Sequence, residues 1–127
     1  MKKIVIIGAN DFQNQLILKA KEMGFETHVF AWQDGSIGER TADHFYPVSI
    51  VEIDEILEKC REIKPDAVAT IASDLANITV SKVAAGLGLP GNTPECIELS
   101  TNKYAMRSAF LKAGLPTPKF YKVDRVI

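Results

Sequence analysis

The segment Lys3-Ile4-Val5-Ile6-Ile7-Gly8 decides the fold class of this chain of 127 residues. It is a short run of mostly β-branched apolar residues that ends in glycine, a pattern typical of a strand buried on both faces of a parallel sheet. Apolar residues then recur at helical spacing from Phe12 to Met23, and Gly24 can adopt the left-handed conformation that ends such a helix. The chain therefore starts with a strand followed by a helix.

The same alternation continues downstream. We predict strands over residues 27–31, 45–48 and 67–72, and helices over residues 53–63 and 76–87. A loop rich in glycine and proline follows, and then a last helix whose apolar residues face inward: Ala105, Ala109, Phe110 and Ala113. Strands that alternate with helices imply right-handed crossovers. The expected fold is therefore α/β, a three-layer α/β/α Rossmann-like domain with a parallel sheet of four to five strands.

The end of the sequence differs from its body. Residues 1–100 have nine basic and fifteen acidic side chains, a net charge of −6, whereas residues 101–127 have six basic and one acidic, a net charge of +5. Gly114, Pro116 and Pro118 end the last helix, and residues 119–123 begin an extended run with no following partner. We interpret residues 1–99 as the Rossmann-like domain and residues 100–127 as a last helix and exit segment leading toward a further domain.

Composition excludes several classes of protein. The chain is 46% hydrophobic and 24% charged, with a net charge of −1, as expected for one globular domain with no main nucleic-acid or anionic-membrane partner. Its longest apolar run, residues 4–7, is too short for a membrane span or a signal peptide, so we expect a cytoplasmic protein. Cys60 and Cys96 show no metal-site spacing, and the chain has only two histidines. We therefore expect no disulfide framework and no metal ligands.

A ligand site is expected where the strands end, because doubly wound α/β domains bind ligands beyond the carboxyl ends of their strands. The first turn, Gly8-Ala9-Asn10-Asp11-Phe12-Gln13, has only the first glycine of a dinucleotide-binding fingerprint, which disfavours a nicotinamide or flavin dinucleotide. Asn10 and Asp11 can cap the first helix or contact a ligand. Ser73 and Asp74 can do the same after the fourth strand. These four residues are the candidate substrate-binding residues. Trp32, Asp34 and Arg40 lie in a glycine-containing loop after the second strand, where an exposed aromatic could stack on a ligand or on a neighbouring domain.

Lys103 is a separate candidate. Ser100 or Thr101 is the natural N-cap of the last helix, which places Lys103 in its first turn, where the helix dipole disfavours a cation. A bound phosphate would turn this lysine and the free amides of the helix into a favourable anion site. The alternative is a long side chain that simply extends into water.

The segment Ser100-Thr101-Asn102-Lys103-Tyr104-Ala105-Met106-Arg107-Ser108-Ala109-Phe110-Leu111-Lys112-Ala113-Gly114-Leu115-Pro116-Thr117-Pro118 resembles the ATP-grasp superfamily. Its members have a lysine opening a helix, then an arginine, an Ala-Gly-Leu/Ile-Pro-Thr-Pro exit and a strand entering the ATP-binding domain. Gly8, Ala42-Asp43 and Lys64-Pro65-Asp66-Ala67-Val68 resemble their N-terminal pre-ATP-grasp domain. Within the superfamily the chain is similar to phosphoribosylglycinamide synthetases, halves of the carbamoyl phosphate synthase large subunit, and amino-acid ligases.

This resemblance implies a ligase that uses ATP and magnesium to convert a carboxylate into an acyl phosphate, which an amine then attacks. Lys103 would contact the nucleotide phosphates, and the loops after strands one and four would help to bind the second substrate. The magnesium carboxylates and most of the nucleotide pocket of the family lie in the downstream ATP-grasp domain. This chain alone is therefore expected to be inactive. A homodimer is left open.

Two departures from the family leave the substrate undetermined. The first turn lacks the Gly-x-Gly frequent in purine-pathway members, and Ser73-Asp74 stands where several members have a glutamate. Two other classes of protein are weighed against a ligase. A receiver-like binding module needs an aspartate after strand three, where the sequence has Val48-Ser49-Ile50. A dinucleotide-binding enzyme domain is disfavoured by the missing glycines, and neither alternative explains Lys103 and the proline-rich exit.

Overall fold

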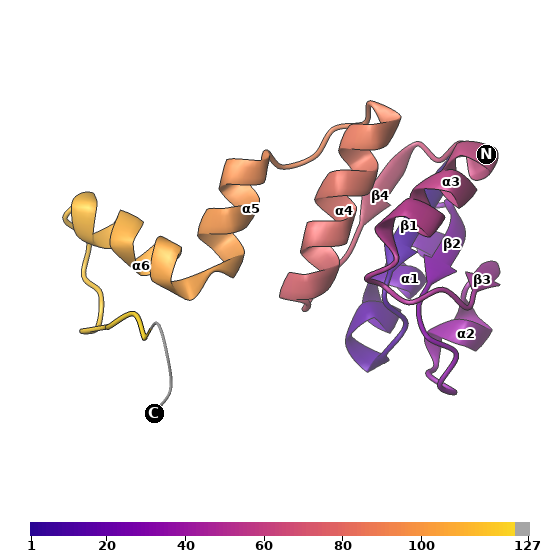
Figure 1. Ribbon diagram of the computed structural model, residues 1–127. Helices are drawn as coiled ribbons and strands as arrows, with labels where there is room; N and C mark the ends of the chain where they lie inside the picture. The colour runs from indigo at the N-terminus through magenta and orange to yellow at the C-terminus, as the bar shows by residue number, and fades with distance from the viewer. Residues whose placement is uncertain (124–127) are drawn as a thin grey trace. The chain divides into compact units, whose positions relative to one another are not determined.

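Strands and helices alternate over the first 87 residues in the computed structural model of the protein, which describes residues 1–123 (Figure 1). The strands are β1 (Lys3–Ile7), β2 (Glu26–Phe30), β3 (His44–Tyr46) and β4 (Ala67–Ala69). The helices are α1 (Asp11–Glu22), α2 (Gly38–Thr41), α3 (Ile53–Ile63), α4 (Asp74–Leu87), α5 (Pro94–Thr101) and α6 (Lys103–Lys112). None of the helices in this part of the chain combines the length and the apolar character needed to cross a membrane.

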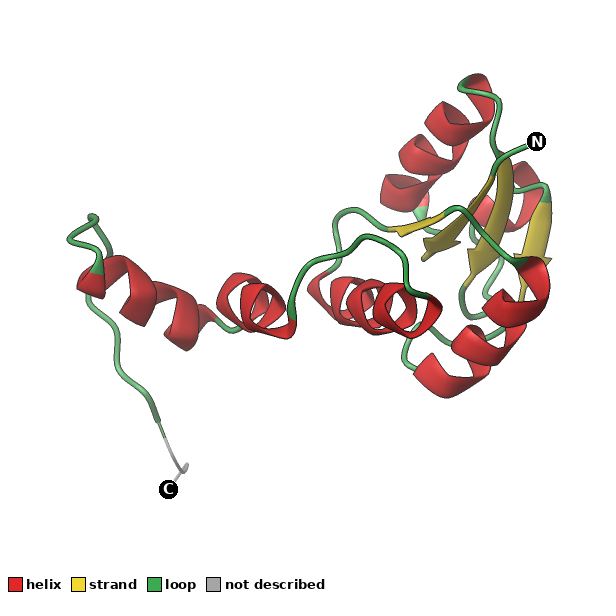
Figure 2. Ribbon diagram, turned by 90° about the horizontal axis from the view of Figure 1, so that it is seen from above, coloured by secondary structure: helices red, strands yellow, loops and turns green. Residues whose placement is uncertain are grey.

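The sheet is fully parallel, with the strand order β3-β2-β1-β4. Figure 2 shows the strands in yellow with helices packed around them. Successive residues of β1 point to opposite faces. Val5 and Ile7 lie in a core on the side of α3 and α4, whereas Ile6 lies in a second core with Ile17 of α1. Both faces of the sheet are thus covered, which confirms the predicted three-layer Rossmann-like α/β fold.

Strand β4 is shorter than predicted, because residues 70–72 leave the sheet. The Thr70 hydroxyl donates to the carbonyl oxygen of Ile7 at 2.6 Å, and Ala72 has a left-handed backbone with φ 59°. Thr70 therefore turns away from the strand ladder while remaining attached to the end of β1.

Two helices were not predicted. The four-residue helix α2 has no apolar periodicity and no side-chain cap. Helix α5 does have a start signal: Thr93 accepts a hydrogen bond from the Cys96 amide at 3.1 Å, and Pro94 occupies the first helical turn. A proline in that position favours a helix start, so interpreting Pro94 as part of a loop was wrong.

The chain divides into two compact units, Met1–Gly91 and Asn92–Ile127. The boundary expected between residues 99 and 100 falls inside α5. The assignment of residues 1–99 to a Rossmann-like domain and of residues 100–127 to an exit segment stays a prediction. The predicted inward face of α6 is partly wrong. Ala105 and Ala109 are half-buried, but Phe110 and Ala113 are exposed. None of the described residues of α6 is fully buried.

We expect backbone amides from Thr117 onward to exchange with solvent much faster than those of β1 and β4. No helix or strand covers residues 113–123, whereas β1 lies inside the sheet and is bonded on both edges. Hydrogen exchange followed by mass spectrometry measures this contrast. Equal protection would contradict it by showing that the exit segment pairs within this chain. The last four residues, to which the same expectation applied, lie outside the described part.

The two cysteines should differ sharply in reactivity. Cys60 is fully buried, and burial raises the pKa of its thiol to about 11, whereas Cys96 is exposed. Because the thiolate is the reactive species, we expect a thiol reagent at pH 8 to modify Cys96 rapidly and Cys60 only on unfolding. Rapid modification of both thiols in the native protein would contradict this expectation. So would rapid modification of the remaining Cys60 in a native Cys96→Ser variant.

Candidate functional site

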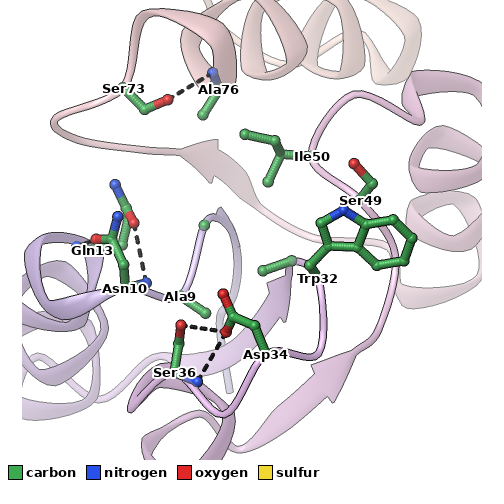
Figure 3. A pocket seen from close by; sticks show the side chains of 12 residues that line it. Ala9, Asn10, Gln13, Trp32, Asp34, Ser36, Ser49, Ile50, Ser73 and Ala76 are labelled. Carbon is green, nitrogen blue, oxygen red and sulfur yellow. Dashed lines mark hydrogen bonds between the residues drawn. The ribbon is translucent and has the colours of Figure 1, made fainter.

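A cavity of about 190 Å³ lies at the carboxyl edge of the sheet, where the sequence placed the ligand site. All four loops that follow the strands contribute to its wall. The lining residues are Gly8, Ala9, Asn10, Gln13, Ala31, Trp32, Asp34, Ser36, Ser49, Ile50, Ser73 and Ala76 (Figure 3).

The loop from β1 to α1 is held by a capping box. The Asn10 side chain accepts hydrogen bonds from the amides of Phe12 and Gln13, and the Gln13 side-chain oxygen accepts from the Asn10 amide at 3.2 Å. Gly8 permits the sharp turn into this loop with φ 104°, and a Cβ there would lie 2.8 Å from the Gln13 side chain. The predicted capping role of Asn10 is therefore confirmed, and Gln13 lies over Gly8 in place of a fingerprint glycine.

Gln13 also connects this loop to the one after β4. Its side-chain nitrogen donates to the carbonyl oxygen of Ile71 at 2.8 Å, and the residue is almost fully buried. Ser73 then caps α4 by accepting a hydrogen bond from the Ala76 amide at 3.1 Å. The two predicted loops are thus bridged by a residue that sequence reasoning treated only as a departure from the dinucleotide fingerprint.

The loop after β2 is attached to the same region through Gly38. The Gly38 amide donates to the carbonyl oxygen of Ala9 at 2.9 Å, and a Cβ at Gly38 would lie 2.7 Å from that oxygen. Only glycine permits this approach. The Asp34 carboxylate accepts hydrogen bonds from the hydroxyl and amide of Ser36, which lower the pKa of Asp34. Asp34 is therefore ionised at neutral pH.

The loop after β3 closes the remaining side. The Thr79 hydroxyl of α4 donates to the carbonyl oxygen of Ile50, and Thr79 is almost fully buried. Ser49 lines the cavity beside Ile50. Each of the four loops is therefore connected to a neighbouring element by at least one hydrogen bond, so the cavity is largely pre-formed.

The cavity offers three kinds of chemistry to a ligand. The Trp32 side chain is 70% exposed and can stack on a planar group. The ionised Asp34 can accept hydrogen bonds from a hydroxyl or an amine. The N-termini of α1 and α4 lie at the cavity, where their helix dipoles favour a negatively charged group, although the Asn10 and Ser73 caps already accept from part of their first amides.

The structure brings together some of the predicted site residues. Asn10 and Ser73 line the cavity, but Asp11 and Asp74 do not. Asp74 lines a separate depression with Thr70 and Asn77. Asp11 and Asp74 are the first residues of their helices, where a carboxylate is stabilised by the helix dipole. Trp32 and Asp34, which the sequence placed in a glycine-containing loop after the second strand, line the cavity, whereas Arg40 of the same loop does not. Ser36 was missed as a ligand candidate.

Lys103 belongs to the second unit, in the first turn of α6 as predicted, but the predicted N-cap was wrong. The cap is Asn102, whose side chain accepts from the Ala105 amide at 3.1 Å. Ser100 and Thr101 instead donate their hydroxyls to the carbonyl oxygen of Ile97, because both end the preceding helix α5. Lys103 is exposed, and no acidic residue shares its helical turn.

The fold is a Rossmann-like α/β fold, consistent with a pre-ATP-grasp domain, and several solved structures share it. The chain matches phosphoribosylglycinamide synthetase from Anaerococcus prevotii with a TM-score of 0.75 and 27% identity, over 89% of this chain and 29% of the other. It matches an L-amino acid ligase from Bacillus licheniformis with a TM-score of 0.79 and 24% identity, over 93% and 32% of the chains.

A further match is N5-carboxyaminoimidazole ribonucleotide synthetase from Thermotoga maritima, with a TM-score of 0.78 and 24% identity over 98% of this chain and 34% of the other. These neighbours are ATP-grasp ligases, so the resemblance noted from the sequence is confirmed. The chain spans about a third of the length of the proteins it matches. No family model matches the sequence, and no curated protein matches it.

Proposed function

We propose that this chain is the N-terminal domain of a cytoplasmic, ATP-dependent ligase that forms a carbon–nitrogen bond. The ligase would use ATP and magnesium to convert a small carboxylate into an acyl phosphate for attack by an amine. The observation that carries the proposal is the pre-formed cavity at the carboxyl edge of the sheet, together with a match to phosphoribosylglycinamide synthetase that covers 89% of this chain. An ADP complex among the other structural neighbours further supports the use of ATP.

Two binding roles are proposed for this chain. The cavity holds the second substrate, with its anionic group toward the N-termini of α1 and α4 and a hydroxyl or amine toward Asp34. Lys103 contacts the nucleotide phosphates. The downstream ATP-grasp domain would supply the magnesium ligands and the adenine pocket. Residues 1–127 alone should then neither hydrolyse ATP nor bind it tightly. A single lysine at the start of a helix cannot replace the magnesium ligands or the adenine pocket.

Replacing Trp32 with alanine tests the role of the cavity. In a protein that contains this chain and the ATP-grasp domain, we expect Trp32→Ala to raise the KM for the second substrate about fivefold, because a stacking contact is worth about 1 kcal/mol. The KM for ATP should not change. ADP release in the presence of paired carboxylates and amines measures both constants.

Phe12 supplies the matched control for Trp32. It is 67% exposed on α1 and does not line the cavity, so Phe12→Ala should change neither constant. If Trp32→Ala and Phe12→Ala changed the KM for the second substrate equally, the cavity would not be the binding site for that substrate. Nicotinamide dinucleotide binding without carboxylate-dependent ADP release would favour the dinucleotide-binding alternative instead.

A further inference from the structure

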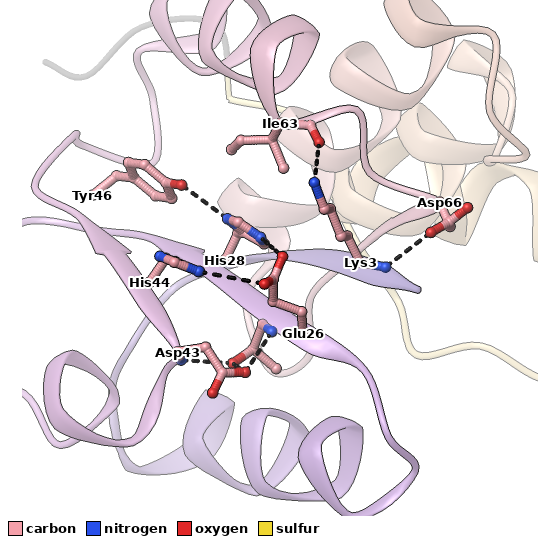
Figure 4. Close-up of polar contacts among 9 residues, drawn as sticks. Lys3, Glu26, His28, Asp43, His44, Tyr46, Ile63 and Asp66 are labelled. Carbon is pink, nitrogen blue, oxygen red and sulfur yellow. Dashed lines mark hydrogen bonds and ion pairs between the residues drawn. The ribbon is translucent and has the colours of Figure 1, made fainter. Parts of the chain in front are cut away.

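Both histidines of the chain lie in one cluster at the edge of the sheet opposite the cavity (Figure 4). Glu26 and His28 project from the same face of β2, two residues apart, and His44 is the direct register partner of His28 on β3. One ligand atom from each of the three residues lies within 4.8 Å of the other two. Glu26 and His44 begin their strands, so the cluster is at the amino edge.

The contacts within the cluster converge on the Glu26 carboxylate. One Glu26 oxygen is 2.8 Å from His28 Nε2, and the other is 3.6 Å from His44 Nε2. An anionic oxygen and two imidazoles are the ligand types that zinc and similar divalent transition metals prefer.

Tyr46 holds His28 from its other side. Its hydroxyl oxygen lies 2.8 Å from His28 Nδ1, and the His28 side chain is only 7% exposed. Metal-binding histidines usually have such a partner on the second ring nitrogen, because it orients the ring. An ion at His28 Nε2 requires the tautomer with its proton on Nδ1, and that N–H would donate to the Tyr46 hydroxyl oxygen.

His44 provides the adjustable ligand. Its side chain is 50% exposed, and its ring stacks on His28 with centroids 4.5 Å apart. Parallel rings do not aim both nitrogens at one ion, so His44 must turn, which its exposure permits. A depression of about 450 Å³ lined by Glu26, Asp43 and His44 gives solvent access. Asp43 itself is occupied by the amide and hydroxyl of Thr27 and by Lys21.

We propose that Glu26, His28 and His44 bind one divalent transition-metal ion, with Zn²⁺ as the representative ion. Such an ion would link the inner strand β2 to the three-residue edge strand β3, and none of its three ligands lines the substrate cavity. Its role would therefore be structural. The site is independent of the proposed ligase function, and it revises the expectation of no metal ligands, which considered only spacing along the chain.

Calorimetric titration of residues 1–127 with Zn²⁺ in a non-chelating buffer tests the proposal. We expect one ion per chain, at least tenfold weaker binding in His44→Gln and Glu26→Gln, and a higher melting temperature with Zn²⁺ only in the unsubstituted chain. Excess Mg²⁺ should not compete, since it prefers all-oxygen sites. Both substituted side chains reach solvent, so the variants are expected to fold, which their circular dichroism verifies.

Cys96 provides the control, because it is the exposed one of the two cysteines and its thiol could bind Zn²⁺ by itself. Cys96→Ser should leave Zn²⁺ affinity unchanged. Binding that survives in His44→Gln but disappears in Cys96→Ser would overturn the proposal, and so would the absence of Zn²⁺ binding by the unsubstituted chain at millimolar concentration.

Discussion

Replacing Lys103 with alanine should lower ATP affinity roughly 10- to 150-fold in a protein that carries this chain with its ATP-grasp domain. The range corresponds to a charge-assisted phosphate contact of about 1.5–3 kcal/mol, at about 1.4 kcal/mol per tenfold. The melting temperature should not fall. Lys103 is exposed in the first turn of α6, where the helix dipole opposes its charge, so its removal costs the fold nothing.

Lys112 supplies the matched control at the other end of the same helix. It is a basic residue in the last turn, where the dipole favours a cation. Lys112→Ala should therefore leave ATP affinity unchanged and reduce stability slightly, the reverse of the Lys103 result. Titration calorimetry and thermal melting separate the two effects. A lower melting temperature with unchanged ATP affinity in Lys103→Ala would make Lys103 a structural residue.

The parts of the fold that were predictable are those with local causes. The apolar residues of β1 are buried on both faces because the alternation of a strand places Val5 and Ile6 in opposite cores. Asn10 caps α1 through contacts no more than three residues away. The location of the cavity followed from the fold class, because parallel strands end at one edge.

The parts that were missed depend on contacts between distant segments. His28 and His44 are sixteen residues apart, and only the parallel register of β2 and β3 makes them neighbours. For Trp32 and Asp34 the sequence left open whether their loop contacts a ligand or a neighbouring domain, and they line the cavity in a loop that the Gly38 amide connects to Ala9. Helix α5 is a different case, since its Thr93-Pro94 start signal was in the sequence and was assigned to a loop.

Gln13 makes both a local contact, to the Asn10 amide, and a distant contact, to the Ile71 carbonyl oxygen. Replacing Gln13 therefore tests how the loops around the cavity are held together. Leucine has a similar volume, so Gln13→Leu removes the polar contacts without opening a large void. The Asn10 amide would lose its acceptor, and the Ile71 carbonyl, 58 residues away, would lose its donor. We expect the free energy of unfolding to fall by about 1–3 kcal/mol, because partly buried polar groups would be left unsatisfied. Denaturant titration measures the change.

Gln15 lies two residues along the same helix and is exposed, so Gln15→Leu should change stability by no more than about 0.5 kcal/mol. The two variants should also differ in hydrogen exchange. Residues 70–73 leave the sheet through the left-handed Ala72 and are attached at Ile71 by Gln13, so Gln13→Leu should accelerate exchange there while Gln15→Leu does not. Equal stability and exchange in the two variants would show that Thr70 and the Ser73 cap hold this loop unaided, and that Gln13 does not build the cavity wall.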